Sequence, residues 1–590
     1  MIRAILILFI FLSITSAQAQ TLIEGGNAGA VNRNYSEQVK KLEVEREFIE
    51  TTPEDLEKEK KRREEEEKQL RDIQKGNVIY NPKFELKDFE FEGNTIYSDD
   101  ELKSLGSDIL GKEVYLADVM DYVVVISRYY QRNGYLTTHA YIPPQQVENG
   151  IIKIIVSESK ISKKNVTGNF WVRKFYITNI LTGCKRMKEG AVFNVKPFQG
   201  VVKQINREPY MKTIIAIEKD EQEKTIIDFD IKDRLPLRLS TSWDDFGRDL
   251  IGRQRWSAIV GSHNLTGLGD RIYGGPILAK HSQAAVAGYE IPISPCGTTL
   301  GFEFSGVKVQ PGGDVSQLGV RGTSRFFTLI AKHPFINTVN TDLIGYAAFD
   351  WIDTKTTIAA VEEPLVNYAL RVPRVGMNLV RDDTKGRWIG NAEVSVGIDG
   401  TGSTGNVAGG PQTSFQKYTA SLIRVQKLPK DILGIVRVNG QYSPQSLFPA
   451  VQMYIGGPYN IWGFQPSELL GDWGVAGGEE LRFPVPGLKK VLPENMKHLG
   501  DRVKIMVFHN WGFIQQNRDV GDIPKNFIQS VGFGAYVNVL ENVNVLVGVG
   551  FPLGSRFFNQ TGARMFFSIS TDLDRFLKPR THMPKKTNAG

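Results

Sequence analysis

The sequence has no long apolar run after its first 19 residues, because no window there approaches the roughly 20 apolar residues that a membrane-spanning helix needs. This absence excludes a protein that crosses a membrane with several helices. It leaves two classes open, a soluble exported protein and a membrane β-barrel, whose strands give a much weaker hydropathy signal. The 58 glycines and the 10% of aromatic residues favour the barrel.

Cysteine and histidine are also scarce, with two and seven residues among the 590. Cys184 and Cys296 fall in different predicted domains, so we expect no disulfide between them, although an exported chain meets an oxidising compartment. The histidines lack the spacing of a metal site, and His509 lies on an alternating strand that we interpret as barrel wall. The sequence therefore predicts no catalytic residues, no enzymatic activity, no metal and no cofactor.

Two further features of the sequence exclude kinds of binding partner, namely nucleotides and nucleic acids. No glycine-rich loop of the kind that cradles a phosphate is present, so we expect no nucleotide. The net charge of +7 is modest and spread along the chain, and we interpret it as solvation rather than nucleic-acid binding.

The first residues have the three parts of a secretory signal peptide. Arg3 supplies the positive charge, residues 4–14 the apolar core, and Ala17-Gln18-Ala19 the cleavage site with small residues. We predict a signal peptide over 1–19, so that the mature chain begins at Gln20. Residues 20–83 then hold a helix at 35–48 and a charged stretch whose Glu-to-basic pairs at i,i+4 are typical of a solvated helix or spacer.

Residues 84–158 have the pattern of a compact β-α-α-β-β unit. Its expected elements, each with strand or helix spacing, are a strand over 84–91, a helix from Ser98 up to Gly111, a helix over 116–132, and strands over 138–142 and 151–156. A second, weaker copy spans 159–233, and residues 201–209 are its clearest part.

From residue 237 to residue 573 the apolar residues alternate with a period of two. We count about sixteen strands of barrel-spanning length, joined alternately by short turns and by long polar loops such as 310–323 and 400–415. That asymmetry is typical of bacterial outer-membrane barrels. The sequence thus predicts a barrel over 234–573, followed by a basic periplasmic tail at 574–590.

Residues 456–478 form a loop rich in glycines and aromatic residues. Paired glycines let the backbone leave a strand sharply, a Trp-Gly-Phe step makes a tight turn, and a Gly-Asp-x-Gly closure returns the chain to an alternating strand. Loops of this length are usually functional or disordered, and we expect function here. The positions that define the loop are Gly456, Gly457, Trp462, Gly463, Phe464, Gly471, Asp472 and Gly474.

This loop and the two β-α-α-β-β units resemble the outer-membrane polypeptide transporters with periplasmic POTRA domains. The chain is most similar to the transporter subunit of two-partner secretion systems, the haemolysin-activator and filamentous-adhesin exporters. Turn motifs at 243–247 and 264–270 are similar to that family too. The resemblance implies a mainly β fold, with a 16-stranded antiparallel transmembrane barrel after two small α+β POTRA domains. It also implies that 456–478 folds back inside the pore, that a helix at 34–49 occupies the pore, and that 50–80 is a linker.

Two positions depart from the family pattern. The resemblance implies an arginine at the loop tip, paired with an aspartate in a Phe-x-Asp-x-Gly strand motif. Here these positions are Trp462 and Asn510, the latter between Phe508 and Gly512. Losing both charges avoids the cost of leaving one buried charge unpaired, roughly 3–5 kcal/mol. We hypothesise that Trp462 docks near Asn510 by packing and by an indole N–H bond; the alternative is that Trp462 only fills space in the lumen.

The resemblance implies an outer-membrane transporter, embedded in lipid, that secretes an exoprotein of the adhesin, haemolysin or haem-acquisition type. Its POTRA domains would lie in the periplasm and capture the exoprotein by adding one of its strands to a sheet edge. The expected groove residues are Val119, Val123, Ile126, Tyr130, His139 and Tyr141. The alternatives are an insertase for outer-membrane proteins, which should have more POTRA units, and a passive porin, which would need neither the units nor the loop.

Overall fold

The structure is a computed structural model. It describes residues 82–573 except 184–186, 207, 209, 220–223, 408–409, 486, 492, 494–499, 501, 518–525, 541 and 555–561. The predicted signal peptide, the predicted pore helix with its linker, and the predicted tail at 574–590 therefore lie outside the described residues.

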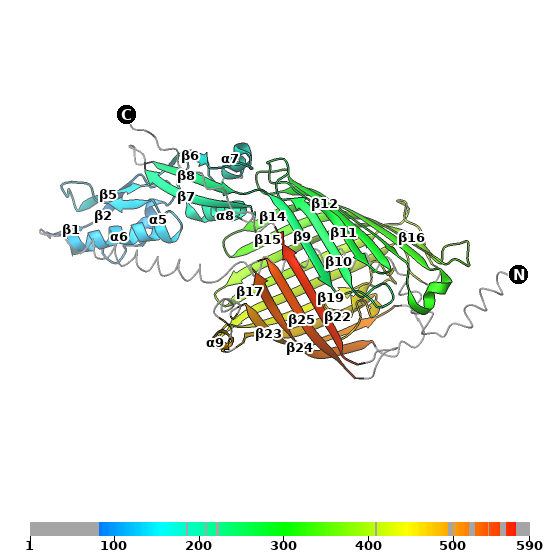
Figure 1. Ribbon diagram of the computed structural model, residues 1–590. Helices are drawn as coiled ribbons and strands as arrows, with labels where there is room; N and C mark the ends of the chain where they lie inside the picture. Colours follow the sequence, from blue (N-terminus) through cyan, green and yellow to red (C-terminus); the bar gives the residue numbers. More distant parts are fainter. Residues whose placement is uncertain are drawn as a thin grey trace, which may run out of the picture.

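The first unit is a small α+β fold at one end of the molecule (Figure 1). Its elements are β1 (Lys83–Leu86), β2 (Asp88–Glu92), α5 (Asp99–Ser104), β3 (Lys112–Tyr115), α6 (Leu116–Arg132), β4 (His139–Tyr141) and β5 (Ile151–Ser157). The main sheet has the order β2-β5-β4, and β1 pairs with β3 in a separate two-stranded sheet. The Ser98 side chain accepts a hydrogen bond from the Glu101 N–H at 3.3 Å and so caps α5, as the sequence pattern predicts.

The strand predicted over 84–91 is two strands. Phe84 and Leu86 stand at even positions, whereas Phe89 and Phe91 stand at odd ones, so a single strand would place them on opposite faces. The chain changes sheets at Lys87, whose N–H donates to the carbonyl oxygen of Gly150 at 2.7 Å. Both Leu86 and Phe89 then reach the same core, where they are buried.

The second unit repeats the arrangement of the first around its own core. It comprises β6 (Ile161–Thr167), α7 (Lys174–Thr182), α8 (Val195–Asn206), β7 (Met211–Lys219) and β8 (Thr225–Asp233), with the sheet order β6-β8-β7. β8 is the central strand, and its residues alternate between full and partial burial. β6 and β7 are therefore the two edges of this sheet.

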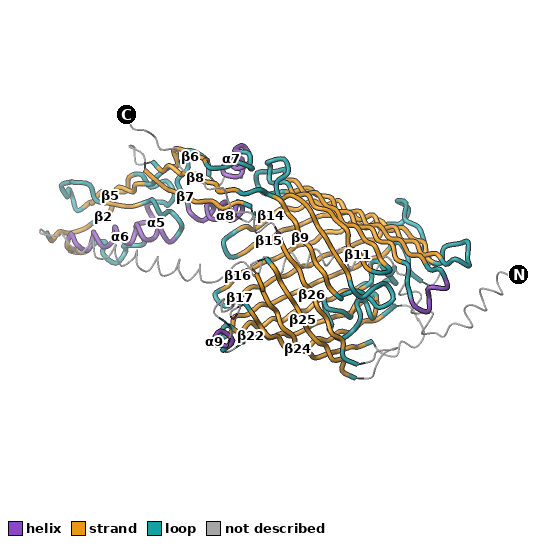
Figure 2. Tube along the Cα trace, viewed as in Figure 1, coloured by secondary structure: helices purple, strands orange, loops and turns teal. Residues whose placement is uncertain are grey.

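A closed antiparallel barrel of sixteen strands follows, which confirms the predicted fold class. Its strands are β9 (Leu237–Asp244), β10 (Arg255–Ser262), β11 (Arg271–Ala279), β12 (Ser282–Pro292), β13 (Thr299–Val309), β14 (Arg321–Asn337), β15 (Thr341–Thr357), β16 (Val366–Asp383), β17 (Gly386–Gly397), β18 (Phe415–Leu428), β19 (Ile432–Tyr442), β22 (Trp473–Pro484), β23 (Val503–Gln515), β24 (Phe527–Leu540), β25 (Val543–Leu553) and β26 (Arg564–Asp572). β26 pairs with β9 and closes the barrel. Figure 2 shows how few helices accompany these strands; η2 (Gly313–Leu318) and α9 (Leu488–Val491) lie in connections between them.

Along the strands of the barrel, alternate side chains face outward. On β23, for example, Val507 is exposed whereas its neighbours Met506 and Phe508 are buried toward the interior. Such alternation is what a wall between lipid and lumen requires. Among the residues that the structure describes, no helix is long and apolar enough to span a membrane.

The second unit is docked on the barrel by three turns, 263–270, 293–298 and 338–340, which connect β10 to β11, β12 to β13 and β14 to β15. Polar contacts join the first and third turns, and the strand residues next to them, to the unit: Asn264 Nδ2 to Trp171 O (3.1 Å), Arg173 N to Gly267 O (2.9 Å), Arg271 of β11 to Glu208 (2.7 Å) and Lys203 to Asp342 of β15 (3.0 Å). The unit is thus held on one stretch of the barrel rim.

The middle turn, 293–298, contains Cys296, which is disulfide-bonded. The chain has one other cysteine, Cys184, which lies outside the described residues. Next to these two positions, Gly183 lies so close to Pro295 that a Cβ added to the glycine would be 2.2 Å from the proline Cβ. The expectation of no disulfide is therefore wrong. It assumed that residues of different domains lie apart, whereas α7 of the second unit ends against this turn.

We predict that the denatured chain migrates faster on a gel without reductant than with it, because the disulfide closes a long loop. The Cys296→Ser variant should migrate identically under both conditions, and Cys184→Ser should behave in the same way. A wild-type chain whose mobility does not respond to reductant would contradict the prediction.

Candidate functional site

The long connection between β19 and β22 folds into the barrel as a hairpin. β20 (Met453–Ile455) and β21 (Leu469–Gly471) pair over three residues each and form its stem. Gly456 and Gly457 have φ angles of 108° and 97°, a region that residues with a side chain avoid, so the chain can leave β20 sharply. The hairpin ends in a tip around Trp462, Gly463 and Phe464, which we call the inward loop tip.

A single side chain, Asn460, gives the tip its shape. Its Oδ1 accepts hydrogen bonds from the N–H groups of Gly456 (2.8 Å) and Ile461 (2.7 Å), and its Nδ2 donates to the carbonyl oxygen of Tyr454 (3.1 Å). Three backbone groups of an irregular, buried segment are thereby satisfied by one amide. The tip is thus a folded structure with its own internal bonds.

The inward loop tip packs against the inner wall formed by β22 to β26. Phe464 and Ile461 are almost completely buried, together with Ile514 and Ile528 of the wall. The indole of Trp462 lies against the rings of Phe508 and Phe566, with ring centroids 5.1 and 5.4 Å apart. Aromatic pairs at such distances add about 0.5–1.5 kcal/mol beyond their burial.

Trp462 lies near Asn510, as we hypothesised, but the group that donates the hydrogen bond is its backbone N–H and not its indole N–H. Asn510 is buried, and its Oδ1 accepts a hydrogen bond of 3.3 Å from the backbone N–H of Trp462. The indole instead packs against two aromatic rings, tilted against Phe508 and edge to face with Phe566. Since the contact uses the backbone of residue 462, it does not depend on which side chain stands there.

Glycines of the wall make room for the tip. A Cβ at Gly550 would lie 2.4 Å from the backbone N of Gly463, and one at Gly548 would lie 2.6 Å from the Trp462 ring. A Cβ at Gly512 would likewise be 2.6 Å from Ile461 Cδ1. β23 and β25 thus present bare backbone where the loop approaches, which is one physical use of glycine in a strand.

Asp472 anchors the base of the hairpin through uncharged donors of the residues that the structure describes. It is fully buried, and its carboxylate accepts hydrogen bonds from Leu447 N (2.8 Å), Gln452 Nε2 (3.0 Å) and Asn517 N (2.7 Å). A buried carboxylate is stable when several donors of this kind surround it. The flanking glycines Gly471 and Gly474 lie against β23, where a Cβ would meet the carbonyl oxygens of Gln515 at 2.8 Å and Phe513 at 2.3 Å.

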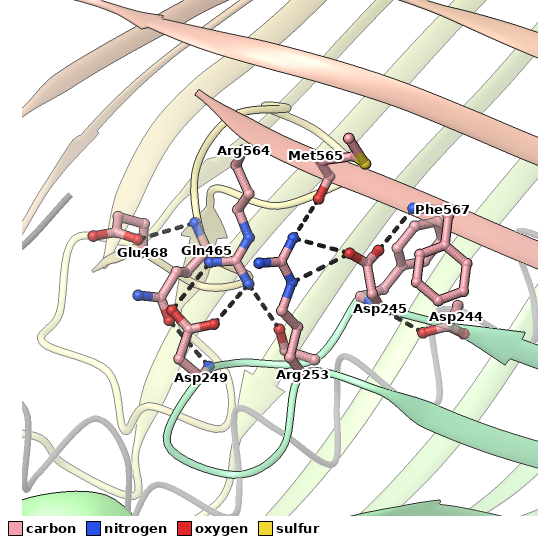
Figure 3. Close-up of polar contacts among 11 residues, drawn as sticks. Asp244, Asp245, Asp249, Arg253, Gln465, Glu468, Arg564, Met565 and Phe567 are labelled. Atoms are coloured by element: carbon pink, nitrogen blue, oxygen red, sulfur yellow. Dashed lines mark hydrogen bonds and ion pairs between the residues drawn. The ribbon is translucent and has the colours of Figure 1, made fainter. Parts of the chain in front are cut away.

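The external loop between β9 and β10 holds the other side of the hairpin (Figure 3). Arg248 donates to the carbonyl oxygen of Ser467 at 3.2 Å, and the Asp249 N–H donates to Gln465 Oε1 at 3.4 Å. The Gln465 N–H in turn donates to Glu468 at 3.1 Å. Burial raises the pKa of the Glu468 carboxyl, and the charge of Arg248 opposes that shift.

The same external loop reinforces the seam between the first and last strands, which pair over only five residues. Asp245 accepts hydrogen bonds from the Phe567 N–H (2.8 Å) and from Arg253 (2.9 Å), and Arg253 also donates to the carbonyl oxygen of Met565 (2.5 Å). Arg564 of β26 pairs with Asp249 at 3.2 Å. The seam and the hairpin therefore share the residues of one short loop (Figure 3).

The structure separates the predicted groove residues into two sets. Val119, Val123, Ile126 and Tyr130 of α6 belong to the core of the first unit, and three of them are fully buried. They cannot line an open groove, because the helical spacing that suggested one is also that of a helix face packed on its own sheet. His139 and Tyr141 stand on β4, with their rings stacked at 6.0 Å and Tyr141 exposed.

Several residues that hold the loop were not predicted as a site. The wall glycines of β25 and the pairs of Arg253 and Arg564 carry no local signal, since each acts across the fold. Asp244 belongs to the turn motif at 243–247, and it is also buried and pairs with the buried Arg255 at 2.7 Å. That motif was the one signal that could have pointed to this loop.

We predict that the Trp462 side chain couples to Phe566 rather than to Asn510. In a double-mutant cycle on thermal stability, Trp462→Ala and Phe566→Ala should interact by about 0.5–1.5 kcal/mol. Trp462→Ala and Asn510→Ala should add within about 0.5 kcal/mol, because the alanine keeps the backbone donor. Stronger coupling to Asn510 than to Phe566 would reject this arrangement.

We also predict that Gly550→Ala destabilises the folded barrel by about 1–3 kcal/mol, since the new methyl group meets backbone atoms that cannot rotate away. The temperature at which the heat-modifiable band disappears on a gel measures this. Gly390→Ala on β17 is the matched control, because the nearest atom to its Cβ would be 3.6 Å away. Equal effects of the two substitutions would contradict close packing at the tip.

Known families match both parts of the chain. A model of the Haemolysin secretion/activation protein ShlB/FhaC/HecB family matches residues 223–518, and a model of the ShlB-type POTRA domain matches residues 84–159. The Heme/hemopexin transporter protein HuxB of Haemophilus influenzae (strain 86-028NP) is 24% identical over 491 residues, covering 80% of this chain and 83% of HuxB. The outer membrane transporter CdiB of Dickeya dadantii (strain 3937) is 22% identical over 430 residues, covering 69% of this chain and 74% of CdiB.

Solved structures agree on the fold. CdiB from Escherichia coli has a TM-score of 0.70 at 16% identity, covering 88% of this chain and 99% of that one. BamA from Haemophilus ducreyi, lacking POTRA domains 1-3, has a lower TM-score of 0.51 at 13% identity, covering 83% and 100%. Because the family model covers half of the chain, including the inward hairpin, the chain belongs to the ShlB/FhaC/HecB family of haemolysin secretion/activation proteins and is an outer-membrane two-partner secretion transporter with its POTRA domains in the periplasm.

Proposed function

We propose that this transporter captures an unfolded exoprotein at the sheet edges of its POTRA units and passes it through the barrel lumen without a catalytic step. The exoprotein is of the adhesin, haemolysin or haem-acquisition type; the relative HuxB is named a heme/hemopexin transporter. The observation that carries the proposal is the family match over the barrel and the inward hairpin, together with two POTRA-like sheets whose edge strands include β4 and β7.

The edge strand of the second unit supports capture more strongly than that of the first. β4 is three residues long, and its Ala140 N–H already donates to Ser127 Oγ at 2.9 Å. β7 has nine residues, and Ile214 and Ile217 are exposed on it. A longer edge offers more backbone hydrogen bonds to an added strand, and its alternate side chains supply apolar contacts.

The lumen wall opposite the hairpin supports passage of an extended chain. Several of its described charged side chains form ion pairs: Arg374 lies 2.8 Å from Asp350 and 2.7 Å from Glu393, and Lys332 lies 2.6 Å from Glu290. Paired charges keep the wall polar without giving it a strong net field.

Deleting the transporter gene from its native host tests the proposal. We expect one exoprotein to disappear from the medium, while the other outer-membrane proteins keep their levels. A general loss of outer-membrane proteins would instead favour an insertase and would reject the proposed function.

We predict that Ile217→Pro reduces secretion about threefold to tenfold, the effect of one lost hydrogen bond of about 0.5–1.5 kcal/mol. The Thr213 N–H points away from β8, since it donates to Asn206 Oδ1 at 2.8 Å, so the N–H of Ile217, four residues on, also faces outward. Proline there removes an edge donor and spares the ladder to β8.

Ile217→Ala is the matched control, because it removes the same apolar side chain but keeps the N–H. It should secrete more than Ile217→Pro, because the edge N–H remains. Both variants should keep the wild-type thermal stability of the barrel, and equal secretion by the two would argue against strand addition at β7.

A further inference from the structure

Three large aromatic side chains of the second POTRA unit are exposed beside the barrel rim. Phe170, Trp171 and Phe175 have exposed fractions of 52%, 36% and 67%, and the first two rings meet edge to face at 5.2 Å. We call these three residues the rim aromatic patch. Contiguous exposed apolar surface of this kind marks a site of contact with another molecule or with a membrane.

The fold holds the patch in its outward position. Asp233, at the end of β8, is buried, and its carboxylate accepts hydrogen bonds from the N–H groups of Phe170 (3.0 Å), Trp171 (2.7 Å) and Val172 (2.9 Å). Val172 itself is buried in the core of the unit. One carboxylate and one core residue thus fix the backbone, and the two aromatic side chains before Val172 stay outside.

The patch continues the lipid-facing surface of the barrel. The carbonyl oxygen of Trp171 accepts a hydrogen bond from Asn264 in the turn between β10 and β11. Leu265 in the same turn is 58% exposed, and the strands on either side carry the exposed residues Val260 and Ile272 on their outer face. In Figure 1, α7 lies beside the connections at this end of the barrel. The apolar surface therefore runs from the wall, across the turn, onto the POTRA unit.

Charge at the patch also matches a phospholipid surface. Arg173 and Lys174 directly follow Trp171 and Val172 in the chain and are exposed. Tryptophan and phenylalanine beside basic residues are the composition that settles at the boundary between head groups and acyl chains.

We propose that the rim aromatic patch inserts into the periplasmic leaflet of the outer membrane, with Arg173 and Lys174 at the lipid phosphates. The second POTRA unit is thereby attached to phospholipid as well as to the barrel turns. The rim aromatic patch is separate from the β7 edge and from the lumen, so this contact with lipid does not depend on whether an exoprotein is bound.

Photo-crosslinking of the full chain tests the proposal. p-Benzoylphenylalanine replaces Phe175 in one variant and Leu136 in the control, a residue of the first unit that is 53% exposed. Each folded transporter is reconstituted into vesicles of phosphatidylethanolamine and phosphatidylglycerol, irradiated, and examined by mass spectrometry. We expect at least about fivefold more phospholipid adduct at position 175 than at position 136, because only the first lies at the lipid boundary.

A repeat with the label at Phe170 guards against a local disturbance at position 175, and the same result is expected. Equal adduct levels at 170, 175 and 136, or no lipid adduct at any of them, would overturn the proposal. Irradiation of whole cells gives a second readout: an adduct of position 175 with another protein in place of lipid would show that the patch binds a protein partner, and would also overturn it.

Discussion

The approach of the inward hairpin to bare backbone on the barrel wall is the contact on which the arrangement of the pore depends. A loop inside a barrel has to satisfy its own backbone groups and find a surface flat enough to pack against. Here the Asn460 side chain binds backbone groups of the loop, and the glycines of β23 and β25 provide the surface against which the loop packs. The rings of Trp462, Phe508 and Phe566 then fill the remaining space. Without the glycines, the tip could not reach Asn510.

The contact between the inward loop tip and the barrel wall joins uncharged groups at Asn510. An ion pair inside the barrel would need both partners, together with hydrogen bonds to the remaining polar atoms. In this chain the amide of Asn510 binds a backbone N–H, and the side chain of residue 462 is left to aromatic contacts. The contact of the inward loop tip with Asn510 is therefore neutral. Charged contacts of the hairpin and the seam lie instead near the first external loop, where Arg248, Arg253 and Arg564 bind carboxylates of that loop and nearby carbonyl oxygens.

Features that depend on local sequence were predictable. The helix Leu116–Arg132 has the predicted bounds, because its apolar spacing and the Asn-Gly step that ends it are local signals. The barrel and its sixteen strands were predictable because the period of two persists over the whole region. The prediction of one strand over 84–91 is wrong at Lys87, where the alternation of apolar residues shifts phase and the chain changes sheets. Even there, the sequence contained the signal.

Features that join distant residues were not predictable. Cys296 and Gly183 are far apart in the chain, and only the docking of α7 on a barrel turn brings their surroundings together. The indole of Trp462 could have met Asn510 or the aromatic rings, and the choice depends on where Gly548 leaves room. The residues of α6 were assigned to a groove because spacing alone does not distinguish a core face from a binding face.

The docking of the second POTRA unit has a geometric consequence for the pore entrance. Its contacts come from the turns that join β10 to β11, β12 to β13 and β14 to β15, which are neighbours on one arc of the barrel. The inward hairpin packs on β22 to β26, which lie on another arc. The entrance of the pore is therefore asymmetric for a chain that comes from the periplasm. The second POTRA unit is docked on one side of the barrel opening, and the hairpin occupies a different side of the lumen.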